Sequence, residues 1–151
     1  MNARVPTKLF TIGYATHSTN SLLDRLTAAG VEVLVDVREL PLSRKRGFSK
    51  LALAKAAAER GVEYRHFRSL GVPSHLRRGR KKGEFNGVAY MEEFRRILIG
   101  NQEALKDALD LVESRPCCLL CLEQHPADCH RSVVAEELRK ISRHGLEIED
   151  L

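Results

Sequence analysis

Cysteine, histidine, acidic and arginine side chains gather in one short stretch near the end of the chain, CLLCLEQHPADCHRS, residues 118–132. These residue types can supply a nucleophile, a proton carrier, metal ligands or an anion site. The stretch follows an apolar run that is typical of a buried strand, and a helical pattern, RSVVAEELRK, follows it. Its chemistry would therefore lie in a loop between a strand and a helix.

Five residues of this stretch are candidates for catalysis or ligand binding. Cys121 and Glu123 lie near the end of the expected strand, where a carboxylate is costly unless it is exposed, paired or chemically active. Cys129, His130 and Arg131 begin the expected helix, whose free N–H groups and dipole favour an anion and lower the pKa of a thiol. We expect Glu123 to be a general acid–base and Cys121 or Cys129 to be a nucleophile. His130 would carry a proton and Arg131 would bind an anion.

The same thiols and imidazoles suit a metal or a redox pair. Cys121, Cys129, His130 and His125 are of the types that bind zinc, but the spacing C-x7-C-H, with Cys and His adjacent, matches no standard zinc finger. The two cysteines also do not form a C-x-x-C motif. We therefore predict an anion site at the helix start, with Asp128 as the helix cap and with no metal or other cofactor. A metal-dependent hydrolase that uses Cys129, His130 and Glu123 is the alternative.

Further candidate residues follow two earlier strands. Asp36 and Arg38 end the β-branched run VEVLVDVR, Arg44 lies in the basic loop after it, and His17 follows the first apolar run. Because the carboxyl ends of parallel strands meet at one edge of a sheet, we expect these residues beside the cysteine stretch. Arg38 and Arg131 would then bind one anion, with Asp36 to orient them and His17 as a second proton carrier.

Strand-like and helix-like segments alternate along the whole chain. The strand patterns cover 8–14, 31–38, 62–67, 117–123 and 146–151. The helical patterns cover 20–30, 50–60, 131–145 and the stretch 87–115, which is one broken helix or two helices, 87–100 and 101–115. This alternation predicts an α/β fold: a single compact domain with a mainly parallel sheet of about five strands and helices on both faces. The cationic, glycine-rich stretch 68–86 is predicted to be a long loop.

Composition limits the class of protein. A chain of 151 residues with 43% hydrophobic residues and no long apolar run indicates one globular domain, away from membranes and in the cytoplasm. All four cysteines lie between positions 117 and 129, which excludes a disulfide scaffold spread along the chain. The net charge of +5, concentrated in two basic stretches, favours a phosphate-bearing small molecule or nucleic acid as the partner. The sequence does not indicate an oligomeric state.

Four motifs follow one another along the chain: TIGYATHS, LVDVRELPLSRKRGF, YRHFRSLG and CLEQHPADCHRSVVAEEL. Together they resemble the DUF488 family, a domain of unknown function. The resemblance covers nearly the whole chain, and the signature C-x-E-x5-C-H-R is specific in combination with the other motifs. The family's first motif is usually closer to T-I-G-H-S, whereas the histidine here is displaced to His17. The resemblance implies a compact α/β domain and no established reaction.

A looser architectural likeness links the chain to rhodanese-like domains. These also have D-V-R after an early strand and a cysteine at a strand end, ahead of an anion-binding loop and a helix. Here the loop is longer and carries Glu123 and Pro126 where a glycine-rich loop is expected. Two functions follow from the residues: an enzyme that acts on a phosphorylated, nucleotide-like or nucleic-acid ligand, and a non-catalytic module that binds nucleic acid or another polyanion.

Overall fold

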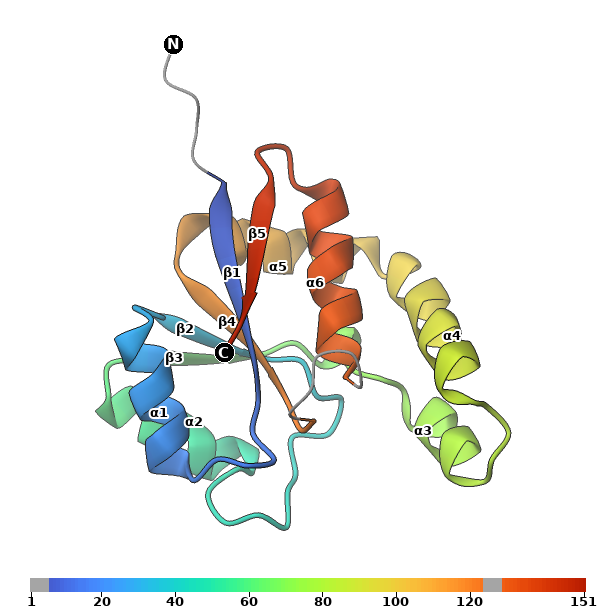
Figure 1. Ribbon diagram of the computed structural model, residues 1–151, viewed down its shortest axis with the longest axis horizontal. Helices are drawn as coiled ribbons and strands as arrows, with labels where there is room; N and C mark the ends of the chain where they lie inside the picture. Colours follow the sequence, from blue (N-terminus) through green and yellow to red (C-terminus); the bar gives the residue numbers. More distant parts are fainter. Residues whose placement is uncertain (1–5, 124–128) are drawn as a thin grey trace.

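An all-parallel sheet forms the centre of the fold in the computed structural model, which describes residues 6–123 and 129–151 (Figure 1). In this described part the strands follow the order β3–β2–β4–β1–β5. They are β1 (Thr7–Gly13), β2 (Val33–Asp36), β3 (Glu63–His66), β4 (Cys117–Cys121) and β5 (Leu146–Asp150). The predicted α/β class and parallel sheet of about five strands are confirmed.

The two central strands are buried along their whole length. Every residue of β2 and β4 is buried, which matches the nearly continuous apolar runs in their sequences. Side chains alternate between the two faces of the sheet, so Cys117 and Cys121 contribute to one hydrophobic cluster and Cys118 to the other. Cys117 and Cys118 are thus small buried core residues.

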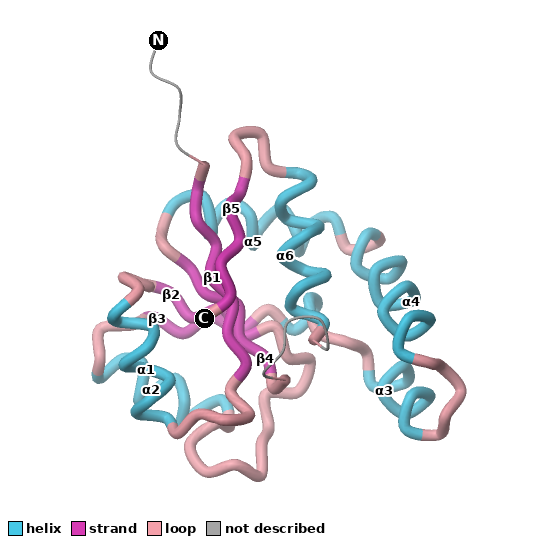
Figure 2. The backbone as a smooth tube through the Cα atoms, viewed as in Figure 1, coloured by secondary structure: helices cyan, strands magenta, loops and turns pink. Residues whose placement is uncertain are grey.

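Helices cover both faces of the sheet, as predicted. α1 (Thr19–Ala28) and α2 (Lys50–Glu59) cover one face, and α5 (Gln102–Ser114) and α6 (His130–Ile141) cover the other (Figure 2). α4 (Gly87–Ile99) packs against the outer side of α6. The longest of these helices have 13 residues, and none of the described helices is long and apolar enough to cross a membrane.

The stretch predicted as one long loop contains two short helices, and this prediction is corrected. A 3-10 turn, η1 (Arg68–Leu70), is followed by α3 (Ser74–Lys81). α3 has almost no apolar periodicity in its sequence, since five of its eight residues are His, Arg or Lys. It is held by Leu76, which is fully buried in the core, and by Gly79, which lies against the ring of Phe85.

The pairing of β1, β2 and β4 defines the edge at which ligand chemistry is expected. Gly13 pairs with Cys121, and Asp36 pairs with Leu120, so the three strands end at the same level. The segments that follow them begin side by side. This register brings the D-V-R motif and the cysteine stretch to one edge of the sheet.

Candidate functional site

A small cavity lies at this carboxyl edge of the sheet. Its volume is about 180 Å³, and it is lined by Tyr14, Arg38, Glu39, Leu40, Leu42, Val72, Arg77, Tyr90, Cys121, Leu122, Glu123 and His130. Four residues predicted from the sequence are therefore on its wall: Arg38, Cys121, Glu123 and His130. The remaining predicted residues lie elsewhere, and their surroundings are described below.

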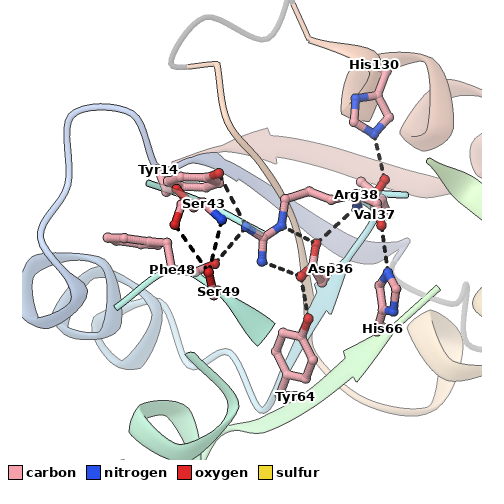
Figure 3. A network of polar contacts seen from close by, with 10 residues as sticks. All are labelled: Tyr14, Asp36, Val37, Arg38, Ser43, Phe48, Ser49, Tyr64, His66 and His130. Atoms are coloured by element: carbon pink, nitrogen blue, oxygen red, sulfur yellow. Dashed lines mark hydrogen bonds and ion pairs between the residues drawn. The ribbon is translucent and has the colours of Figure 1, made fainter. Parts of the chain in front are cut away.

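Asp36 forms the base of a closed polar network at the end of β2 (Figure 3). It is fully buried, and its Oδ1 accepts hydrogen bonds from the backbone N–H of Arg38 at 3.1 Å and from Nε of Arg38 at 2.8 Å. Its Oδ2 accepts a hydrogen bond from Nη2 of Arg38 at 2.6 Å and another from the hydroxyl of Tyr64. Both carboxylate oxygens thus accept two hydrogen bonds each, which fills the capacity of the group.

Arg38 is held on its other side as well. Nη1 donates to the carbonyl of Phe48 at 2.7 Å and to the hydroxyl of Tyr14 at 3.3 Å. Burial alone would lower the pKa of Arg38, but the hydrogen bonds and negative charge of Asp36 raise it above the usual value. Because four of its five N–H donors are used by these partners, Arg38 shapes the cavity wall more than it offers a free cation.

Two histidines fix the backbone between these residues and the rest of the edge. Nε2 of His66 lies 2.6 Å from the carbonyl of Arg38, and Nε2 of His130 lies 2.7 Å from the carbonyl of Val37 (Figure 3). A carbonyl only accepts, so the proton of a neutral His130 is on Nε2 and Nδ1 carries the lone pair. Burial lowers the pKa of His130 to about 4, which keeps the ring neutral near pH 7.

The end of β4 brings the two site cysteines together. Cys121 and Cys129 are joined by a disulfide in the structure, and Nδ1 of His130 lies 4.0 Å from the Cys129 sulfur. One ligand atom from each of these three residues lies within 4.8 Å of the others. Cys121 reaches the cavity, whereas Cys129 is 0% exposed behind it. The structure therefore brings together a group that the sequence spacing had disfavoured.

Glu123 lies beside this group at the cavity mouth. Its side chain is exposed, and its Oε2 lies 3.6 Å from the Cys121 sulfur. Its carbonyl accepts a hydrogen bond from Nη1 of Arg131. Glu123 thus lies at the junction of the strand end and the cavity, and its role as an acid–base stays a prediction.

Arg131 is 1% exposed and is not among the residues that line the cavity. Its Nη1 is 3.6 Å from the sulfur of Cys121, so the guanidinium lies beside the thiol, behind the cavity wall. Burial lowers the pKa of Arg131 from its usual value. Arg38 and Arg131 therefore do not face a common ligand space in this cavity, contrary to the arrangement expected from the sequence.

Two other predicted residues lie away from the cavity. Nδ1 of His17 is 3.0 Å from the hydroxyl of Ser21 at the start of α1, and burial together with nearby cations lowers the pKa of His17. Arg44 is exposed in the loop after β2. His125 and Asp128 lie outside the described residues, and α6 begins with Cys129 at its N-cap position.

The cavity also contains polar residues that the sequence analysis did not select. Nη2 of Arg77 donates to Glu39 at 2.9 Å, and the hydroxyl of Ser74 donates to the same carboxylate at 2.5 Å. Burial alone would raise the pKa of Glu39, but these hydrogen bonds lower it overall. Burial and the charge of Glu123 raise the pKa of Tyr90. The basic stretch around Arg77 is the signal in the sequence that could have identified this residue. Its position at the cavity depends on helix α3, which was not predicted.

Gly71 allows the α3 segment to approach the cavity wall. A Cβ atom on Gly71 would lie 2.1 Å from the backbone nitrogen of Glu39 and 2.8 Å from the carbonyl carbon of Arg38. These contacts are with backbone, which cannot move aside as a side chain can. A glycine is therefore required where the two segments cross.

A larger groove continues from the cavity along α4. It has a volume of about 690 Å³ and shares Tyr90 and Glu123 with the cavity. Arg80 and Arg95 line it, and the guanidinium of Arg80 lies 4.9 Å from the centre of the Tyr90 ring. Cavity and groove together offer a small pocket with reactive groups and a wider approach to it, lined by two arginines and also by Glu92 and Glu123.

Comparison with known proteins gives a family and no function. No curated protein and no solved structure matches the chain. Residues 18–138, which include the ends of β2 and β4 and the start of α6, match the family described as "Domain of unknown function DUF488". The chain therefore belongs to the DUF488 family.

Proposed function

We propose that the protein is an enzyme that acts on a small phosphate-bearing molecule of the nucleotide class, with the reacting group in the cavity and the phosphate at the border between the cavity and the groove beside it. The observation that carries this proposal is that Cys121, Glu123 and His130 line one cavity, beside a groove whose wall includes Arg80 and Arg95. Groups able to transfer protons and groups able to bind an anion are thus reached by one ligand.

The size and lining of the cavity favour a ring-sized reacting group. A volume of about 180 Å³ is small for a whole ligand, since ligand pockets usually measure roughly 300–1,000 Å³. Three leucines on the lining are exposed: Leu40, Leu42 and Leu122. They offer apolar contact to a base or sugar ring, while the rest of the ligand extends into the groove.

Glu123 is the acid–base of the proposed reaction. Its carboxylate is at the junction of cavity and groove, exposed to a ligand in either space. Tyr90 keeps its proton at neutral pH, because burial and the charge of Glu123 raise its pKa, and it can donate a hydrogen bond to the ligand. General acid–base catalysis of this kind contributes on the order of 10²–10⁴ in rate.

Arg77 and Arg80 are the proposed phosphate ligands. Both are exposed on α3, Arg77 on the cavity wall and Arg80 on the groove. Arg77 has to exchange one partner, because it is paired with Glu39 in the structure. A phosphate offers the same planar guanidinium two oxygens, so the exchange replaces one charged hydrogen-bond partner by another.

Binding and turnover test this proposal in two steps. Thermal shift is measured with AMP and ribose 5-phosphate, and with adenosine and ribose as uncharged counterparts. We expect the phosphates to raise the melting temperature and the uncharged molecules to have a smaller effect. Arg77→Gln and Arg80→Gln should weaken the shift, whereas Arg78→Gln, on the same helix but outside both spaces, should not.

Turnover of a bound phosphate is then followed by mass spectrometry of the reaction mixture. We expect Glu123→Gln to bind the ligand and to lose at least about 100-fold in turnover. Binding without turnover in the natural protein, at any pH between 5 and 9, would contradict an enzyme and support a binding module. Equal shifts with charged and uncharged ligands would contradict the phosphate class.

One observation favours a second candidate, a module that binds nucleic acid. Beyond Arg77 the end of α3 presents four further exposed cations: Arg78, Arg80, Lys81 and Lys82. When such a cluster binds the phosphates of a nucleic acid, counterions are released from the nucleic acid. The affinity would therefore fall steeply as the salt concentration rises. Fluorescence anisotropy with a single-stranded oligonucleotide at 50 and 200 mM salt tests it, and no measurable affinity at the lower salt removes this candidate.

A further inference from the structure

We propose that, when the Cys121–Cys129 disulfide is reduced, Cys121, Cys129 and His130 form a zinc site with one coordination position open to the cavity. The inference starts from the grouping of two sulfurs and one imidazole nitrogen, each within 4.8 Å of the others. Two cysteines and one histidine are a ligand set that zinc accepts, and three protein ligands with one open position are typical of zinc that binds water or substrate. The site deepens the proposed function, because it adds a metal to the same cavity.

The backbone separation of the two cysteines supports an ion between them. Their Cα atoms are 7.1 Å apart, outside the range of about 4.4–6.8 Å that disulfides usually span. Cys121 comes from the end of β4 and Cys129 from the N-cap of α6, and Arg131 fixes these two elements to each other. A metal accommodates this separation without moving the strand relative to the helix.

His130 is prepared for coordination by its backbone partner. Its Nε2 donates to the carbonyl of Val37, so Nδ1 carries the lone pair and is directed to the side of the Cys129 sulfur. A histidine ligand whose other nitrogen donates to a carbonyl is the usual arrangement around protein-bound zinc, since the bond fixes both tautomer and ring direction. The adjacent positions of Cys129 and His130 are compatible with joint ligation because the chain turns into α6 between them.

The buried surroundings of the two sulfurs are compatible with the net charge of a zinc ion bound by two thiolates and one imidazole. Zinc binding replaces the thiol protons of Cys121 and Cys129, so two protons leave and the zinc with two thiolates and a neutral imidazole has no net charge. Nη1 of Arg131 donates toward the Cys121 sulfur at 3.6 Å, a contact that stabilises a thiolate. The near-complete burial of both sulfurs thus encloses a neutral group.

The open coordination position is on the cavity side. Cys121 and His130 line the cavity, whereas Cys129 is enclosed behind it. Glu123 is next to Cys121, at 3.6 Å from carboxylate to sulfur, but it is outside the group of ligand atoms. It is therefore available to accept a proton from a water at the open position, which is the acid–base role proposed above.

Metal binding by the whole protein, without any substrate, tests the site. The protein is reduced, stripped with a chelator and titrated with Co²⁺ and then Zn²⁺. We expect about one Co²⁺ per chain, with the sulfur-to-cobalt charge-transfer absorption that only thiolate ligands give, and its loss when Zn²⁺ displaces the Co²⁺. This readout needs no variant, so it decides the question even where a substitution impairs folding.

Variants then assign the ligands. Cys121→Ala and Cys129→Ala should each lose stoichiometric binding, while Cys117→Ala, a matched change at another buried cysteine of β4, should keep it. Glu123→Gln should also keep the metal and lose turnover, which separates this site from the acid–base proposal. A reduced protein with four free thiols that binds no metal would overturn the inference. So would loss of the metal in Cys117→Ala to the same extent as in Cys121→Ala.

Discussion

The neighbouring strands β2 and β4 both lead into an acidic residue, but Asp36 is buried whereas Glu123 is exposed. At the end of β2, the carboxylate of Asp36 has its bonding capacity filled by Arg38 and Tyr64. At the end of β4, the sulfur of Cys121 and the side chain of Glu123 line a cavity. A polar group whose partners are all within the protein maintains the fold, whereas one directed to a cavity keeps capacity for a ligand.

The same difference assigns different roles to two acidic residues that the sequence analysis names as candidate site residues. Asp36 and Glu123 are both acids at the end of an apolar run, on adjacent strands of one edge. Their partners decide their roles: Asp36 stabilises a buried cation, and Glu123 is exposed at the mouth of the cavity. We therefore expect substitutions at the β2 end to affect the stability of the fold most, and those at the β4 end to affect chemistry.

The largest effect is expected from Asp36→Ala. The change leaves the guanidinium of Arg38 buried without its charge partner, which costs about 3–5 kcal/mol of the free energy of unfolding. Asp24→Ala is the matched control, because Asp24 also pairs with an arginine at 2.6 Å but on the exposed surface. Its cost should be about 0–1 kcal/mol. Urea unfolding followed by circular dichroism measures both, and similar costs would contradict the structural role of the β2 end.

The second effect concerns the reactivity of the four thiols in reduced, metal-free protein. Cys121 lines the cavity and should be alkylated first, whereas Cys129, favoured by its position at a helix start, is fully enclosed. Burial raises the pKa of Cys117 to about 12 and raises that of Cys118 well above its usual value. These two thiols react only when the sheet opens, so we expect them to be at least about 100-fold slower.

Iodoacetamide labelling with mass spectrometry gives the four rates. Labelling in urea above the unfolding transition is the control, since all four thiols should then react at similar rates. Reaction of Cys117 as fast as that of Cys121 in the folded protein would mean that the β4 end is no more open than its beginning.

A smaller effect is expected from Tyr64→Phe. The change removes one hydrogen bond to Asp36 but keeps the ion pair with Arg38, so the free energy of unfolding should fall by about 1–2 kcal/mol. Tyr90→Phe makes the same chemical change on the cavity wall and should cost less than about 0.5 kcal/mol. Thermal and urea unfolding compare the two, and a larger cost for Tyr90→Phe would reverse the distinction between the two strand ends.

Much of this arrangement follows from the sequence. The alternation of apolar runs and helical patterns predicts the parallel sheet, and the rule for parallel strands predicts that the D-V-R motif and the cysteine stretch share one edge. That rule brings Arg38, Cys121, Glu123 and His130 together without any knowledge of side-chain directions. It describes the ends of strands, which depend on backbone register alone.

The rest depends on contacts that no local pattern contains. The partner of Arg38 is Asp36, two residues earlier, whereas the sequence analysis expects Arg38 to bind an anion together with Arg131. The direction of Arg131 depends on how α6 is rotated against β4. α3 is not predicted from the sequence, because only one buried leucine, Leu76, anchors a helix of mostly charged residues. Without α3, the sequence gives no reason to place Arg77 at the cavity.

The smallest effect on stability is expected from Glu123→Gln. The side chain is exposed and the substitution keeps its size, so the free energy of unfolding should change by less than about 0.5 kcal/mol. Asp36→Asn, the same loss of charge at the end of β2, removes the partner of a buried guanidinium and should cost several times more. Urea unfolding of the two variants side by side makes the comparison directly. If Glu123→Gln instead costs more than about 1.5 kcal/mol, its carboxylate is as much a part of the fold as that of Asp36, and the end of β4 has to be regarded as a second structural network rather than the open side of a reactive cavity.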